Sequence, residues 1–341
     1  MRITRGTLLK NARNLVAERL HTNRSLVCIY LTGSLINDKP LLGGVTDIDL
    51  IFVHEETLNK EREIVRLTDE VHFDIAHYSQ KKFNHPRQLR TDPWLGSFLC
   101  KDPIVLHDTR HWFEFTQASV CAQFYQPENI LNRAQPLIEG ARQRWFNLSE
   151  GTHSCSPENI LVYLKSLEYA ANAISILSGP PLAERRFILE YPARTEAIRR
   201  PGLSSGLEDL FSSPSENAFE WGLFQSGWEE AFLTCGQTEN TPAKLSSCRV
   251  AYYKQAIESL YPQYPAAALW ICLHTWTLAA SFLEKKTGTE EKEWRSFCQQ
   301  MGLHVENMDA RLEALDVYLD NIEEVLDLWA EENGLPPLSE R

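Results

Sequence analysis

Apolar and polar residues alternate in short runs over the first third of the chain, whereas apolar residues recur every three or four positions over most of the remainder. Short apolar runs bounded by polar and turn residues are typical of β-strands, and apolar residues that recur every three or four positions are typical of helices. The pattern predicts a helix at 5–21 and strands at 26–31, 47–53, 71–78 and 104–106. The expected fold class is α+β, with a small mixed sheet followed by a mainly helical domain.

Two structures compete for residues 58–70. Side-chain polarity alternates from Ile64 to Thr68, which favours a strand that forms a hairpin with the next strand through a turn at 68–70. The competing structure is a helix. Both leave Asp74 in the following strand, where it is the only acidic residue.

The helical pattern begins near Trp112, so the predicted domains are 1–110 and 111–341. A polar segment at 147–158 is a candidate linker, and the segment at 200–217, which contains Pro and Gly, is expected to be rich in loops. The predicted helices of the second domain are at 113–124, 130–145, 157–178, 218–234, 244–260, 266–286, 290–301 and 305–332.

The last predicted helix carries apolar residues at alternating steps of four and three, which is the spacing of a heptad seam. The seam consists of Met308, Leu312, Leu315, Leu319, Ile322, Leu326 and Trp329. Such a seam indicates either a helix that lies along the core of the helical domain or the interface of a homodimer.

The composition is that of a globular protein. The chain has 341 residues, of which 43% are hydrophobic and 23% charged, so it is long enough for two domains with substantial cores. No apolar run approaches the roughly 18 to 20 residues of a membrane span, and the amphipathic N-terminal segment lacks the apolar block of a secretory signal. The expected location is the cytoplasm.

The eight cysteines include no Cys-x-x-Cys pair and are expected to be free, mostly buried thiols.

The net charge constrains the class of partner. At −12, it argues against a nucleic-acid partner, because an extended interface with nucleic acid needs clustered Lys and Arg. An acidic surface suits a small, cationic acceptor better.

The residues with the clearest chemistry surround the first two predicted strands. Gly33 and Ser34 follow the first strand, and Asp47 and Asp49 open the second. Alternate side chains of a strand share a face, so the two carboxylates are expected side by side. Such a pair repels itself unless a cation lies between its members, and Mg²⁺ prefers oxygen ligands. A Gly-Ser turn lets backbone N–H groups and a hydroxyl approach a phosphate.

This ordered set resembles the signature of the polymerase-beta-type nucleotidyltransferase superfamily, in which Gly-Ser or Gly-Gly precedes an Asp-x-Asp or Asp-x-Glu between apolar residues. The matching residues are Gly33, Ser34, Asp47 and Asp49. The family usually supplies a third carboxylate from a later strand, and Asp74 is the matching residue here. The resemblance lies within the predicted first domain.

The resemblance implies an enzyme that transfers a nucleoside monophosphate, most simply AMP from ATP, to a hydroxyl of a small, aminoglycoside-like acceptor. Asp47 and Asp49 would bind two Mg²⁺ ions, and Asp74 would complete the metal site on the acceptor side. Gly33 and Ser34 would hold the β- and γ-phosphates. Within the family, the acceptor could instead be a protein or an RNA end. Outside it, the alternative is a catalytically idle regulator that binds nucleotide or a partner.

Further residues are candidates for accessory roles. In small-molecule members of this superfamily, the helical domain often supplies an acid that activates the acceptor, and Glu168, in a polar stripe of a predicted helix, is a candidate for that role. The basic residues that are candidates for contact with phosphate or acceptor are Lys39, Arg87, Arg90, Arg185 and Arg186.

Overall fold

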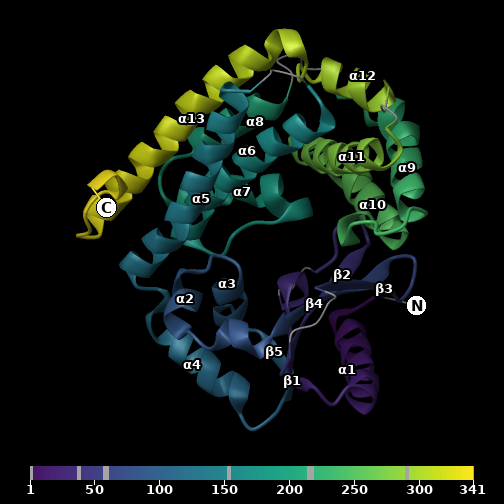
Figure 1. Ribbon diagram of the computed structural model, residues 1–341, viewed down its shortest axis with the longest axis vertical. Coiled ribbons are helices and arrows are strands. Elements are labelled where there is room, and N and C mark those ends of the chain that lie inside the picture. The colour runs from purple at the N-terminus through teal and green to yellow at the C-terminus, as the bar shows by residue number, and fades with distance from the viewer. Residues whose placement is uncertain are drawn as a thin grey trace. The chain divides into compact units, whose positions relative to one another are not determined.

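The computed structural model describes residues 3–36, 40–56, 61–151, 155–212, 219–288 and 292–340, and Figure 1 labels their helices and strands. These residues form an α+β protein with a five-stranded mixed sheet, which confirms the predicted class. The chain divides into two compact units, Met1–Asn129 and Ile130–Arg341. The first unit contains the sheet, and the described elements of the second are all helical.

The sheet lies entirely within the first unit. Its strands are β1 (Leu26–Thr32), β2 (Thr46–His54), β3 (Arg62–Arg66), β4 (Val71–Ser79) and β5 (Ile104–Asp108). Their order is β3-β4-β2-β1-β5. β2 and β4 run parallel, and the other neighbouring pairs are antiparallel. The central strands β1, β2 and β4 are the most apolar, as expected for strands that are buried on both faces.

Helices cover both faces of this sheet. On one face, α1 (Arg5–Thr22) packs Leu8, Ala12 and Val16 against apolar side chains of β1, β2 and β4. On the other face lie the helices α2 (Pro86–Thr91), α3 (Leu95–Cys100) and α4 (Trp112–Phe124). Any acidic side chain on a central strand is therefore an exception within an apolar environment.

β3 and β4 form the predicted hairpin, so the alternative of a helix is wrong for the described residues 61–70. Thr68 stabilises the turn, because its Oγ1 accepts hydrogen bonds at 3.2 Å from the backbone N–H groups of Glu70 and Val71. The turn sets the register of the hairpin, in which Ile64 lies opposite Asp74.

The boundary between the units differs from the predicted one. The helix now labelled α4 was expected to belong to the helical domain, but its Phe113, Val120 and Phe124 are buried in the core that α2, α3 and the sheet share. The first unit therefore extends to Asn129 rather than to residue 110. An amphipathic pattern shows that a helix has a buried face, but it does not show which core receives that face.

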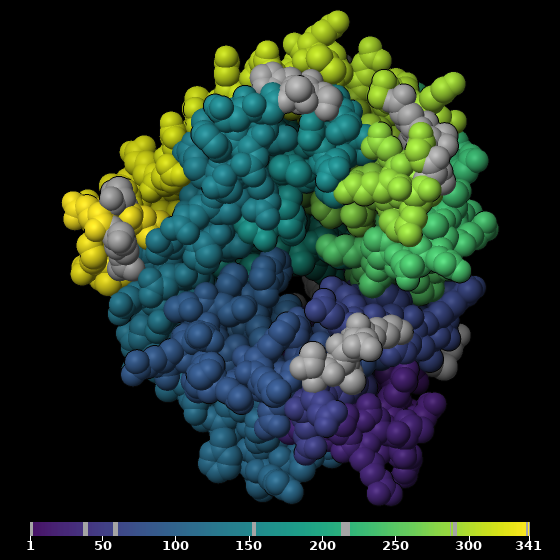
Figure 2. Space-filling model, in the orientation of Figure 1, coloured from purple at the N-terminus to yellow at the C-terminus, as the bar shows by residue number. Residues whose placement is uncertain are grey.

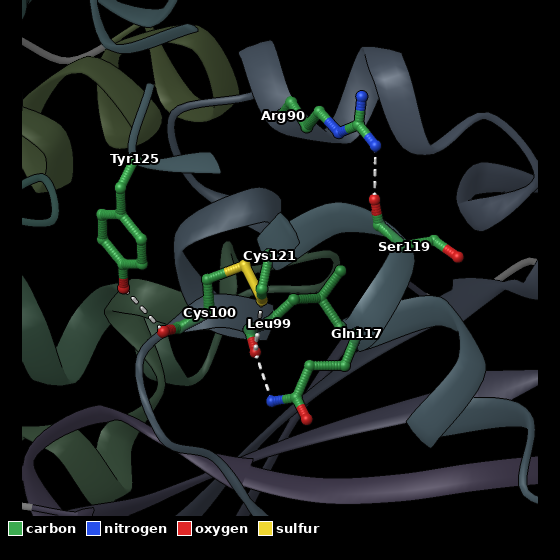
Figure 3. Close-up of a disulfide and its surroundings, with 7 residues drawn as sticks. All are labelled: Arg90, Leu99, Cys100, Gln117, Ser119, Cys121 and Tyr125. Carbon is green, nitrogen blue, oxygen red and sulfur yellow. Dashed lines mark hydrogen bonds between the residues drawn. A yellow bond between two sulfur atoms is a disulfide. The ribbon is translucent and has the colours of Figure 1, made fainter. Parts of the chain in front are cut away.

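Two cysteines contradict the expectation of free thiols. Cys100, at the end of α3, and Cys121, in α4, form the disulfide drawn in Figure 3. The side chains of Gln117 and Tyr125 donate hydrogen bonds to the carbonyls of Leu99 and Cys100, each at 2.8 Å, and so join the same two helices. The other six cysteines are free. Pairing of cysteines that are 21 residues apart depends on how α3 and α4 pack, which the spacing of cysteines does not reveal.

Loss of this disulfide is expected to lower the free energy of unfolding of the first unit by about 3 kcal/mol, because the cross-link restricts the unfolded chain. The measurement is urea unfolding of the wild type with and without dithiothreitol, beside the Cys100→Ala/Cys121→Ala double variant. The reductant should lower the midpoint of the wild type and leave that of the double variant unchanged. An equal shift in both proteins would show that the effect of the reductant does not arise from this bond.

The second unit is a helical assembly. Its helices are α5 (Pro127–Ser149), which begins at the end of the first unit, α6 (Pro157–Ser178), α7 (Phe187–Ala197), α8 (Gly202–Phe211), α9 (Trp221–Gly236), α10 (Val250–Leu260), α11 (Pro265–Thr287), α12 (Lys292–Gln300) and α13 (Val305–Glu332). α6 begins at the predicted residue because the Ser156 hydroxyl accepts a hydrogen bond at 3.2 Å from the backbone N–H of Asn159.

α8 lies in the segment 200–217, which was expected to be rich in loops. That expectation is wrong for the described part of the segment, because α8 buries an apolar face that includes Leu207 and Phe211. A Cβ at Gly206 would lie 3.4 Å from the Tyr318 ring, so this glycine lets α8 and α13 pack closely. Gly202 and Gly206, which suggested a loop, thus lie within a helix whose structure depends on tertiary packing.

The apolar seam of α13 is buried inside a single chain, as the alternative of a core helix predicts. Its residues are buried from Met308 to Leu326, and Trp329 is partly exposed. α13 packs on α6 and α8 through this face. Acidic residues, among them Asp309 and Glu313, lie on the exposed face of the helix, which forms part of the yellow surface in Figure 2.

Two described helices, α6 and α11, are long and apolar enough to cross a membrane, in contrast to the expectation that no apolar segment approaches that length. In each of them, 78% of the most apolar stretch is buried inside the protein. Such burial is characteristic of the core helices of a globular unit, and α6 and α11 pack against each other.

Candidate metal and nucleotide site

The three acidic residues identified from the sequence lie together at one end of the sheet. Asp47 and Asp49 share a face of β2, and Asp49 is paired with Asp74 in the parallel register of β2 and β4. One carboxylate oxygen from each residue lies within 4.8 Å of the others. Asp47 and Asp74 are buried, and Asp49 is partly exposed. Three carboxylates are thus held within the coordination distance of one cation.

Gly33 brings the end of β1 against this acidic group. Thr32, the last residue of β1, is paired with Asp49, and Gly33 follows with φ of +73°. A Cβ on Gly33 would lie 1.8 Å from Oδ2 of Asp49. The absence of a side chain is therefore required both by the left-handed backbone and by the adjacent carboxylate.

Ser34 adds a hydroxyl beside the acidic group. Its Oγ is buried, and among the described residues no group forms a hydrogen bond with it. A buried hydroxyl is normally hydrogen-bonded, and an exception needs an explanation such as a bound ligand. The Ser34 hydroxyl is thus a donor that a phosphate oxygen would use.

The set of donors fits a hard divalent cation. All the atoms that converge are carboxylate oxygens, which Mg²⁺ and Mn²⁺ prefer, and no described His or Cys joins them in the cluster. Asp49 is the partly exposed member of the group, so it is the carboxylate that solvent reaches.

Arg62, on β3, also contacts the acidic group and was missed by the sequence analysis. Its Nε and Nη2 donate hydrogen bonds to the two carboxylate oxygens of Asp74, at 2.6 and 2.7 Å. Arg62 is paired with Ala76 in the hairpin, so it lies diagonally across from Asp74 on the same face. The alternation of residues in β3 places Arg62 on one face of the strand, but the contact with Asp74 can be predicted only when the register of the hairpin is known.

Of the basic residues of the first unit that were candidates for phosphate contact, the structure describes Arg87 and Arg90. Lys39 lies outside the described residues. Arg87 is exposed on α2. Arg90 donates hydrogen bonds to Gln123 and to the carbonyl of Ser119, each at 2.6 Å, so it connects α2 with α4 (Figure 3).

In the second unit, Glu168 is buried rather than part of an exposed polar face. It accepts a hydrogen bond at 2.7 Å from Lys165. Burial alone would raise the pKa of Glu168, but the positive charges of Lys165 and Lys244 and the nearby His274 lower it overall. Glu168 is therefore ionised, and its charge is stabilised by lysines of its own unit.

Arg185 and Arg186 have different environments. Arg185 is buried, stacks 3.4 Å above the centre of the Tyr252 ring, and donates a hydrogen bond to the Tyr252 carbonyl. Arg186 forms a 3.7 Å ion pair with Glu190 one helical turn away. Both arginines thus have contacts that stabilise the helical unit.

A small surface depression in this unit was not foreseen from the sequence. Its lining includes Glu184, Lys244, Tyr253 and His274. Glu184 has φ of +46° and binds Lys244 at 3.1 Å and the Tyr253 hydroxyl at 2.9 Å. Burial, with the charge of Lys244, lowers the pKa of His274 to about 4, so its imidazole is neutral at pH 7.

A histidine pair occupies the opposite ends of β2 and β4. Nε2 of His54 lies 3.0 Å from Nδ1 of His77. Burial, together with His77, lowers the pKa of His54 to about 4. The pair lies on the face of the sheet that α1 covers, because the side chains of a strand alternate, so it is not part of the acidic group.

No protein-family model matches this chain, and no curated protein matches it. The acidic group, the Gly-Ser turn and their geometry are therefore the features from which a function can be inferred.

Proposed function

We propose that the protein is a magnesium-dependent nucleotidyltransferase that transfers a nucleoside monophosphate, most simply AMP from ATP, to a hydroxyl group of a small molecule. The observation that carries this proposal is the convergence of Asp47, Asp49 and Asp74 beside the Gly33-Ser34 turn. An acidic cluster alone would indicate only a cation site. A cation site next to a turn that combines a glycine with a buried serine hydroxyl suits a metal-bound polyphosphate.

The residues of the site would have different roles, which follow from their positions. Asp47 and Asp49 would hold the metal ions that accompany the nucleotide, and the turn at Gly33 and Ser34 would bind its β- and γ-phosphates. Two Mg²⁺ ions, when bound, would neutralise phosphate charge and orient the attacking and leaving oxygens. Asp74, on the far side of Asp49 from β1, would complete the metal site on the acceptor side and would help to deprotonate the acceptor hydroxyl.

The order of the strands supports this division. Gly33 follows β1, the acid pair lies on β2, and Asp74 lies on β4, so the parts lie in sequence across neighbouring strands. An in-line displacement needs the leaving pyrophosphate and the attacking hydroxyl on opposite sides of the α-phosphorus. Phosphate binding at the β1 end and acceptor binding at the β4 side would satisfy that requirement.

The class of acceptor follows from charge. The chain carries a net charge of −12, which favours the approach of a cationic acceptor. An aminoglycoside combines several hydroxyls with several ammonium groups. We therefore propose an aminoglycoside-like polyol as the acceptor.

The test is an assay of pyrophosphate release with each of the four ribonucleoside triphosphates and Mg²⁺, across a panel of aminoglycosides and uncharged polyols. Release that requires one acceptor, with a product heavier by one nucleoside monophosphate in mass spectrometry, is the expected result. If the nucleotide binds but no small molecule supports release, the same assay with protein and RNA acceptors decides between another acceptor class and a regulator without catalysis. Failure of the nucleotide to bind with Mg²⁺ would contradict the proposed function.

A further inference from the structure

The ion pair between Arg62 and Asp74 places a cation on the acidic group without a metal. Both carboxylate oxygens of Asp74 accept hydrogen bonds from the guanidinium, at 2.6 and 2.7 Å. The side chain of Asp74 is 2% exposed, whereas that of Arg62 is 43% exposed. The pair therefore consists of a fixed, buried acid and a base that reaches it from solvent.

A metal ion and this guanidinium would use the same carboxylate. Asp74 contributes an oxygen to the group of three that lies within 4.8 Å, and that oxygen also belongs to the carboxylate that Arg62 binds in a fork. A divalent cation at this position and an arginine bound through two hydrogen bonds would repel each other at short range. Simultaneous binding of the metal ion and the Arg62 guanidinium to Asp74 is therefore unfavourable, so binding of one requires the other to move away.

The position of Arg62 makes it the cation that can leave. β3 is the edge strand of the sheet, and Arg62 is its first residue. Its side chain is half exposed and does not belong to the apolar cluster on this face of the sheet, so its displacement from Asp74 does not require that cluster to open. Asp74 has no such freedom, since it lies in a central strand.

We propose that Arg62 competes with the divalent metal for Asp74, so that the site holds its own arginine until the metal displaces it. The proposal rests on the proposed function, because it needs the acidic group to be a metal site. In the absence of metal, the guanidinium offsets the repulsion among the three carboxylates. Metal binding then exchanges one cation for another at Asp74, which places the metal ion on the acceptor side of the site.

The experiment is a titration with Mn²⁺, in which electron paramagnetic resonance measures the free ion, without nucleotide or acceptor. The proteins are the wild type, Arg62→Gln, Arg62→Lys and Arg66→Gln. Arg66 is a matched control on the same strand and face, because it is exposed and pairs with Asp69 in the turn. Circular dichroism and thermal unfolding establish that each variant is folded.

Arg62→Gln should bind Mn²⁺ roughly tenfold more tightly than the wild type, the order expected for loss of a partly exposed, charge-assisted competitor. Arg62→Lys keeps the charge but loses the fork, so its affinity should lie between those two. Arg66→Gln should bind like the wild type. Equal affinities in all four proteins would overturn the proposal, and so would equal gains in Arg62→Gln and Arg66→Gln, which would indicate only a long-range effect of charge.

An Asp49→Asn variant separates this inference from the proposed function. If Mn²⁺ binds the wild type and Asp49→Asn abolishes that binding, the metal site exists. An unchanged affinity for Mn²⁺ in Arg62→Gln would then refute the competition by Arg62 but not the metal site. If none of the proteins binds Mn²⁺, even Arg62→Gln, the metal site itself and the proposed function both fail.

Discussion

Replacement of Asp49 with asparagine is expected to reduce nucleotide-dependent pyrophosphate release about a thousandfold or more, because the metal ions supply several kcal/mol of stabilisation to the transition state. Asp49 is the centre of the site: it is paired with Asp74 across the parallel strands and lies against Gly33. Asparagine keeps the size of the side chain and removes its charge. Loss of one of three mutually repelling carboxylates should leave the stability of the fold unchanged or slightly raised.

The measurement combines the pyrophosphate assay with thermal unfolding in the presence and absence of Mg²⁺. The wild type should gain thermal stability from Mg²⁺, since a ligand that binds only the folded state stabilises it, and Asp49→Asn should not. Asp69→Asn is a suitable control, because Asp69 is an exposed carboxylate in the β3–β4 turn. Turnover in Asp49→Asn that stays within tenfold of the wild type would remove Asp49 from the catalytic site.

Replacement of Gly33 with alanine is expected to lower activity about a hundredfold, the order that follows from a displacement of roughly 1 Å in a catalytic group. The new Cβ would lie 1.8 Å from Oδ2 of Asp49, so either the turn or the carboxylate must move. The φ of +73° adds a backbone penalty of about 1 to 2 kcal/mol to the free energy of unfolding.

Gly334→Ala separates the two effects. Gly334 has φ of +72°, and a Cβ there would meet no atom within 4 Å. This control should carry the backbone penalty in urea unfolding and retain full pyrophosphate release. If Gly33→Ala loses as much stability as Gly334→Ala but keeps its activity, the contact of Gly33 with Asp49 does not determine the position of the Asp49 carboxylate.

The elements of the fold that the sequence predicted well are those with a strong local pattern. Short apolar runs next to turn residues identified β1 and β2, alternation identified β4 and the β3–β4 hairpin, and the period of three to four identified α6 and α13. The convergence of the three acids was also predictable, because each lies in a strand pattern and Asp47 and Asp49 must share a face. Their joint position in one sheet required only that β2 and β4 be neighbours.

The features that the sequence did not predict depend on contacts between distant elements. The pairing of Arg62 with Asp74 follows from the register of the hairpin, and the Cys100–Cys121 disulfide follows from the packing of α3 on α4. Glu168 was a candidate acid because it lies in a polar stripe of the predicted helix, but the stripe does not show that Glu168 is buried. The assignment of α4 to the first unit likewise required knowledge of which core it completes.

All the parts of the candidate site come from one continuous segment, from Gly33 to Asp74, and the unit that holds them ends at Asn129. Such a segment can fold from the N-terminus during synthesis, as domains generally do. The catalytic chemistry would then be complete on the nascent chain before most of the helical unit emerges from the ribosome. The helical unit would be free to change in sequence over evolution, and with it the acceptor, without loss of the chemistry that acts on the nucleotide.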